Sequence, residues 1–126
     1  MAQARWQVIV PLGTLTVSGA GSTVLLSANC GPLGGQQGTD WKNPPVPGQS
    51  FRQIMLINAD SGGNAFLLPR GRTASGNPGN IITIIPSGGL PIYIPSGQPF
   101  ENGILPENFV LDCDAACTVY GFGILS

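Results

Sequence analysis

Glycine and proline recur so often along this chain that a long helix cannot form in it. Nineteen glycines and twelve prolines are spread over 126 residues. In a helix interior glycine costs about 1 kcal/mol relative to alanine, and proline about 3 kcal/mol. Apolar residues make up 42% of the sequence and gather in short runs, which favours a buried core over disorder. The chain is therefore expected to be built from short strands.

The expected strands are eight or nine short segments, each bounded by turn residues. Residues 51–59 form the clearest segment, because an alternating pattern with two largely apolar faces predicts a strand inside a sheet. The other segments are 5–10 (ending at Pro11), 14–17, 23–28, 64–69, 80–85, 90–94, 108–113 and 117–125. Turns at 18–22 and 60–63 predict hairpins. The spacing predicts an all-β fold, a two-sheet antiparallel sandwich or jelly roll of about eight short strands, with a barrel as the alternative.

The length suits a single β-sandwich domain over residues 1–126. Residues 1–10 are available as an N-terminal contact arm. Residues 29–50 have no strand pattern and are expected to form a long contact loop, since loops of this length are usually functional or disordered. No apolar run reaches about 18 residues, and no signal-peptide pattern is visible. We therefore expect cytosolic synthesis and no membrane partner.

Charge is unusually sparse in this sequence. Five Lys or Arg stand against six Asp or Glu, and 9% of residues are charged, compared with about 25% in an ordinary domain. The lack of a basic excess argues against direct nucleic-acid binding, which requires clustered Lys and Arg. A polar, nearly uncharged surface gives little protection against association. This favours an oligomer or an assembly component, with a weakly charged monomer as the alternative.

The residue types of most catalytic and metal sites are missing. The chain has no histidine, which removes Ser-His-Asp and Cys-His arrangements and the commonest metal ligand. Cys113 and Cys117 are expected as buried thiols, with a disulfide as the alternative. Asp112 and Asp114 are expected as a polar strand end, with calcium binding as the alternative. The glycines in 121–123 are expected to mark a bulge or a close backbone approach. We expect no enzymatic activity, no cofactor and no metal.

Five residues are the candidates for protein contacts: Trp6, Trp41, Lys42, Arg70 and Arg72. Trp41 lies in the 29–50 loop ahead of a proline-rich segment, and a tryptophan on a stiff loop suits a contact anchor. Packing of Trp41 on its own domain is the alternative. For Trp6 the alternative is a place on a sheet face or in the core.

The order of segments in the C-terminal half carries a family likeness. The segments are 54–58, 65–69, 97–103, 105–112 and 118–125. Over residues 51–126 this order resembles the small β-sandwich or jelly-roll decoration (cement) proteins and minor structural proteins of tailed bacteriophages.

The resemblance implies a virion protein on the capsid surface that bridges subunits of the major capsid protein, often as a homo-oligomer, with a trimer favoured. On that interpretation Trp6 and the loop around Trp41 contact neighbouring subunits, and Arg70 and Arg72 pair with acidic capsid groups. One alternative is a tail or head-fibre component. Another is a carbohydrate- or receptor-binding module in which Trp41 and Tyr93 stack on sugar rings.

Overall fold

The computed structural model describes residues 9–28, 50–59, 62–74, 77–95 and 103–124. They form eight strands and two short 3-10 turns. The elements are β1 (Ile9–Val17), β2 (Val24–Leu25), β3 (Gln53–Asn58), β4 (Ala65–Pro69), η1 (Pro78–Asn80), β5 (Thr83–Ile85), β6 (Ile92–Ile94), η2 (Pro106–Asn108), β7 (Phe109–Cys113) and β8 (Cys117–Ile124). The expectation of an all-β fold is confirmed.

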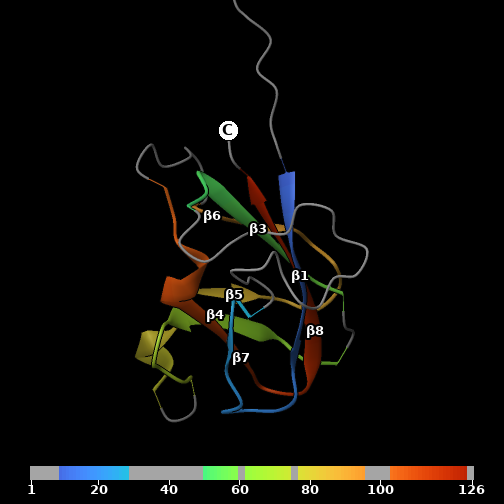
Figure 1. The fold of residues 1–126 in the computed structure, drawn as a ribbon. Coiled ribbons are helices and arrows are strands. Elements are labelled where there is room, and N and C mark those ends of the chain that lie inside the picture. Colours follow the sequence, from blue (N-terminus) through green and yellow to red (C-terminus); the bar gives the residue numbers. More distant parts are fainter. Residues whose placement is uncertain (1–8, 29–49, 60–61, 75–76, 96–102, 125–126) are drawn as a thin grey trace, which may run out of the picture.

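The strands form two antiparallel sheets of four, in the orders β1-β8-β3-β6 and β2-β7-β4-β5 (Figure 1). Each strand of the first half pairs with its counterpart counted back from the end: β1 with β8, β2 with β7, β3 with β6 and β4 with β5. Successive pairs alternate between the two sheets. A ribbon of paired strands wound up in this way is a jelly roll. The predicted sandwich or jelly roll is confirmed, and so is the interior position of β3.

The two predicted hairpins are wrong, because both turns carry the chain from one sheet to the other. After the turn at residues 18–22, β2 pairs with β7 and not with β1. After the glycines that follow β3, β4 pairs with β7 and β5. Among the described strands, only β4 and β5 are both consecutive and paired. Turn residues set where a chain reverses, whereas the burial of an apolar face decides which strand becomes its partner.

Strand β1 continues through Pro11, where the sequence predicted its end. It lies at the edge of its sheet, where a proline is tolerated because its missing N–H need not bond a neighbour. The pairing with β8 shifts between Pro11 and Gly13, and Gly13 has a φ of 94°, which glycine adopts at little cost. This bulge sets Leu12 and Leu15, three residues apart, on the same buried face.

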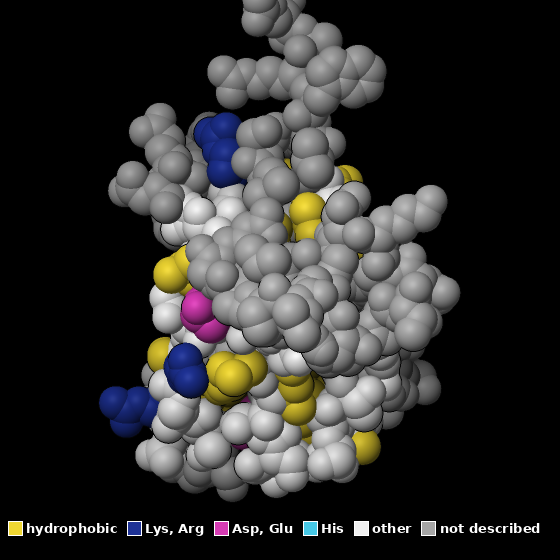
Figure 2. All heavy atoms as spheres, in the orientation of Figure 1, with side chains coloured by type: hydrophobic (Ala, Val, Ile, Leu, Met, Phe, Trp, Pro, Cys, Tyr) yellow, Lys and Arg dark blue, Asp and Glu magenta, His cyan; other side chains and the backbone are white. Residues whose placement is uncertain are grey.

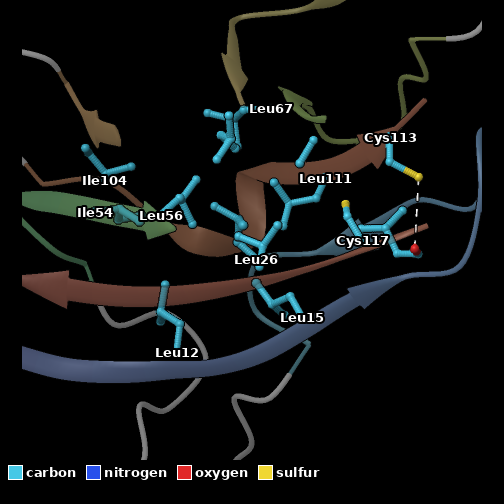
Figure 3. Close-up of a cluster of buried hydrophobic side chains, with 14 of the residues drawn as sticks. Leu12, Leu15, Leu26, Ile54, Leu56, Leu67, Ile104, Leu111, Cys113 and Cys117 are labelled. Atoms are coloured by element: carbon cyan, nitrogen blue, oxygen red, sulfur yellow. Dashed lines mark hydrogen bonds between the residues drawn. The ribbon is translucent and has the colours of Figure 1, made fainter. Parts of the chain in front are cut away.

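The core lies between the two sheets (Figure 3) and receives apolar side chains from every described strand. In β3, Ile54 and Leu56 face the core while Met55 and Ile57 face outward. Alternation of this kind follows from the two-residue period of a strand. In the part of the chain that the structure describes, no helix is long and apolar enough to cross a membrane.

Two glycines of β8 bring its backbone against core side chains. A Cβ on Gly123 would overlap the ring of the fully buried Phe51, whose Cγ would lie 2.7 Å away. A Cβ on Gly121 would lie 3.2 Å from Leu12 Cβ. The predicted close approach therefore occurs, but the neighbours are side chains and not another backbone.

Candidate interaction surfaces

The described outward-facing side chains of the sheet β1-β8-β3-β6 are all uncharged. Residues directly opposite each other in an antiparallel sheet share a face, so these side chains form rows across the strands. The rows are Pro11, Phe122, Met55 and Tyr93, then Thr14, Tyr120 and Ile57, then Thr16 and Thr118. Tyr93 is 43% exposed and Tyr120 is 40% exposed. We call this surface the tyrosine face.

A second apolar surface lies on the outer side of the other sheet. Ile84 stands opposite Phe66 in the pairing of β4 with β5. Ile82 continues the same edge, because its backbone N–H donates to the carbonyl of Leu67 at 2.7 Å. Ile82 and Ile84 are about half exposed, at 50% and 51%. Large apolar side chains exposed side by side mark a contact surface more often than single ones do.

Arg70 and Arg72 lie in the exposed turn after β4, the strand that pairs with β5 and its Ile84. The backbone N–H of Arg72 donates to the carbonyl of Pro69 at 3.2 Å. No described residue forms an ion pair with either guanidinium. We call Phe66, Ile82, Ile84, Arg70 and Arg72 the isoleucine–arginine surface. Of the five contact candidates, the described residues include these two arginines, which share one turn, and Trp6, Trp41 and Lys42 lie outside the described residues.

The two surfaces face away from each other, because each is the outer side of one sheet and the inner sides pack together. On the face seen in Figure 2, the described charged side chains are few and are separated by uncharged surface. The sequence already carried a signal for both surfaces. The strand at 53–57 is apolar on both faces, and the run at 81–85 is almost entirely isoleucine, so one side of each had to remain outside the core.

Asp112 is a fully buried carboxylate that joins three backbone segments. Its Oδ1 accepts hydrogen bonds from the N–H of Gly21 at 2.7 Å and of Cys113 at 2.8 Å. Its Oδ2 accepts from the N–H of Ala74 at 2.8 Å. The carboxylate therefore ties the β1–β2 turn and the loop that carries Arg72 onto the sheet. Asp112 lies at the polar end of β7 as predicted, but it is buried, and its two oxygens are occupied by backbone donors.

A second polar group fixes the end of the sandwich around Asn58, which is also fully buried. The side-chain amide of Asn58 donates to the carbonyls of Gly63 at 2.8 Å and Ile85 at 3.2 Å. Nearby, Asp114 Oδ1 accepts from the N–H of Asn64 at 2.8 Å. Asp114 is exposed, so the two aspartates that the sequence placed on one face have different environments.

Cys113 and Cys117 are both buried in the core, and the structure holds them as reduced thiols. Cys113 Sγ lies 4.0 Å from the carbonyl oxygen of Val17, to which it donates (Figure 3). Burial, followed by the negative charge of Asp112, raises the pKa of the Cys113 thiol above its usual value. The thiol is thus protonated at neutral pH and is a poor nucleophile.

The raised pKa of Cys113 predicts a loss of stability in alkaline solution. In the unfolded chain the thiol loses its proton at about pH 8.5, whereas in the folded chain it does so only at higher pH. Stability from the buried thiol is therefore complete below that pH and falls above it, by at most about 1.4 kcal/mol per pH unit. Urea unfolding under reducing conditions should show that the destabilisation caused by Cys113→Ala shrinks between pH 7 and 10. A constant difference would contradict the prediction.

Within the described segments, no three His, Cys, Asp or Glu side chains gather closely enough to hold a metal ion. The carboxylate of Asp112 and the thiol of Cys113 are side-chain groups of the kind used in catalysis. Both are buried and make hydrogen bonds that stabilise the fold. The accessible features are the two surfaces on the outer sides of the sandwich. No protein-family model, no curated protein and no solved structure matches this chain.

Proposed function

We propose that this protein is a non-enzymatic structural component of a bacteriophage virion, which decorates and stabilises the capsid by bridging subunits of the major capsid protein. The observation that carries the proposal is the pair of exposed, largely apolar surfaces on opposite outer sides of one sandwich. A bridging protein needs two contact surfaces that can be occupied at the same time. A sandwich with one such surface on each sheet meets that requirement.

The low charge and the fold are compatible with this role. A nearly uncharged surface is more easily desolvated against another protein than a charged one is. Eight-stranded jelly rolls occur in viral capsid proteins, but also in lectins. The fold alone therefore does not decide between these functions, and the choice depends on the two surfaces and on the resemblance of residues 51–126 to decoration proteins.

We assign direct contact with a capsid subunit to the isoleucine–arginine surface, which leaves the surface on the other sheet to join a neighbouring subunit or a second copy of this chain. Its centre is apolar, with Ile82 and Ile84 half exposed, and its rim carries Arg70 and Arg72. Interfaces commonly combine an apolar centre with a polar rim, and arginine is enriched in them. On a capsid the same modest contact is repeated over the lattice, so simultaneous engagement strengthens the attachment without any new contact.

The first test is sedimentation of a lysate of the native source on a density gradient, with this protein followed by mass spectrometry. We expect it in the particle fraction at a copy number comparable to that of the major capsid protein. A few copies per particle would instead indicate a tail or head-fibre component. Recovery only as a small protein at the top of the gradient would contradict a virion role.

The second test locates the contact with substituted protein added to particles that lack it. We expect Ile84→Arg, and separately the charge reversal of Arg70 and Arg72 to Glu, to weaken binding by about tenfold, since central contacts in interfaces are typically worth more than 1 kcal/mol. Leu90→Arg is the matched control, because Leu90 is also exposed and lies outside both surfaces. Equal occupancy by all variants would remove the isoleucine–arginine surface from the proposal.

A carbohydrate-binding module is the second candidate, favoured by the exposure of Tyr93 and Tyr120 on one face. Tyrosine rings exposed on one face suit stacking on sugars, since the ring is apolar and the hydroxyl is polar. This alternative predicts that the isolated protein binds glycans on an array and that Tyr93→Ala abolishes the signal. Absence of glycan binding, together with recovery in particles, would exclude it.

A further inference from the structure

We infer that the tyrosine face is the surface through which two copies of this chain pack against each other. Nothing in the inference depends on a capsid, since it concerns the isolated protein. It follows from the charge, the area and the chemistry of that face.

The distribution of charge is the first argument. None of the four strands β1, β8, β3 and β6 contains a charged residue. The described charged residues lie elsewhere, before β3, after β4, in η2, within β7 and in the turn that follows β7: Arg52, Arg70, Arg72, Glu107, Asp112 and Asp114. The strands of the other sheet contain one charged residue, the buried Asp112, so the described charged side chains that reach the surface lie outside the strands.

The absence of charge makes a second copy of the chain a suitable occupant. In a two-fold contact the same patch meets itself, so any charged side chain would approach its own copy or a neighbour of the same set. The tyrosine face avoids that repulsion in its described rows. A partner with charged groups would have to desolvate them against a surface that offers no described counter-charge, which is costly. The chain itself supplies a matching uncharged surface.

The size of the face is the second argument. With strands about 4.8 Å apart and a rise of about 3.4 Å per residue, strands of nine, eight, six and three residues outline on the order of 400 Å² per copy. Stable specific interfaces begin at about 1,000 Å² for both partners together. Two tyrosine faces supply somewhat less than that area, which places the contact among weak, transient associations. A concentration-dependent dimer in the micromolar range is the expected form.

The exposed residues suit self-contact chemically. Tyr93 and Tyr120 combine apolar rings with hydroxyls that both donate and accept hydrogen bonds, so a tyrosine of one copy can pair with a tyrosine or threonine of the other. Phe122, Met55 and Ile57 are partly exposed between them and supply apolar area. Aromatic residues and methionine are enriched in interfaces, and charged residues are depleted at their centres.

The test is sedimentation velocity of the purified full chain over a wide concentration range. We expect a monomer–dimer equilibrium, with Tyr120→Arg raising the dissociation constant about tenfold or more. Tyr93→Arg, on a different strand, should act in the same direction, so the result does not depend on one variant folding well. Ile84→Arg and Leu90→Arg are the matched controls and should leave the equilibrium unchanged, with circular dichroism confirming the fold of all four.

A chain that stays monomeric at every concentration would overturn the inference, as would an oligomer that tolerates arginine at both tyrosines. A trimer, which the resemblance to decoration proteins implies, would overturn it too, because two-fold pairing of one face produces a dimer. These outcomes are separable from the capsid proposal. A monomer that still occupies particles would contradict only the self-contact, and a dimer that binds no particle would contradict only the virion role.

Discussion

Replacing Asp112 by alanine is expected to lower the free energy of unfolding by about 3 to 5 kcal/mol, because each buried donor left without a partner costs about 1–3 kcal/mol. Three backbone N–H groups, of Gly21, Ala74 and Cys113, donate to this carboxylate. Alanine would leave all three without this acceptor, and the cost is largest at the buried N–H of Cys113, because Gly21 is exposed and Ala74 is half-buried. Urea unfolding at constant pH measures the loss, and hydrogen exchange should show it first at the amides of Gly21 and Ala74.

Two substitutions give this prediction its controls. Asp112→Asn keeps one oxygen in place, so it can preserve the two bonds made by Oδ1 while it loses the bond from Ala74, and it should cost about half as much. Asp114→Asn removes a carboxylate two residues away that is exposed and accepts one described bond, from Asn64. It should cost less than about 1 kcal/mol. Equal effects at Asp112 and Asp114 would contradict the proposal that Asp112 ties the two loops onto the sheet.

The second large effect is expected from Gly123→Ala, which should destabilise the protein by about 2 to 4 kcal/mol through overpacking. The added methyl would overlap the ring of Phe51, which is fully buried and cannot swing into solvent. The backbone of Phe51 is also held, since its N–H and carbonyl both bond Ile104. Relief therefore requires a shift of β8 or of the ring, and either one disturbs the core.

Gly121→Ala is the matched control, two residues earlier on the same face of β8. Its methyl would lie 3.2 Å from Leu12 Cβ, a tight contact that a small displacement relieves, so its cost should be less than half as large. A Phe51→Leu background should reduce the cost of Gly123→Ala, because the smaller side chain leaves room for the methyl. If Gly121→Ala proves the more damaging of the pair, the role assigned to the Phe51 ring is wrong.

The sequence predicted the strands better than it predicted their partners. Residues 53–58 and 117–124 were recognisable because alternation and turn residues are local signals. The partner of β2 was not recognisable, since it pairs with β7, more than eighty residues away along the chain. Such pairing is decided by which apolar faces can be buried together, a property of the whole chain. The bulge at Gly13 was not recognisable either, because it results from packing in the core and not from the nearby Pro11.

The candidate surfaces show the same division between local and distant causes. The exposure of Ile82, Ile84 and Tyr120 follows from a pattern with too many apolar residues for one core, and that pattern is visible in the sequence. The burial of Asp112 depends on Gly21 and Ala74, which arrive from two other parts of the chain. An aspartate at the end of an apolar strand resembles a solvated strand end until those two loops are placed.

The pairing of Ile9 with Ile124 also governs when this chain can fold during its synthesis. Strand β8 lies between β1 and β3 (Figure 1), so the sheet cannot close around β1, the first described strand, until β8, the last described strand, has been synthesised. Contacts this distant in sequence form slowly, because a long loop must be ordered first. A chain cut short before residue 117 would leave β1 and β3 without their common neighbour, and only full translation yields a domain with both surfaces in place.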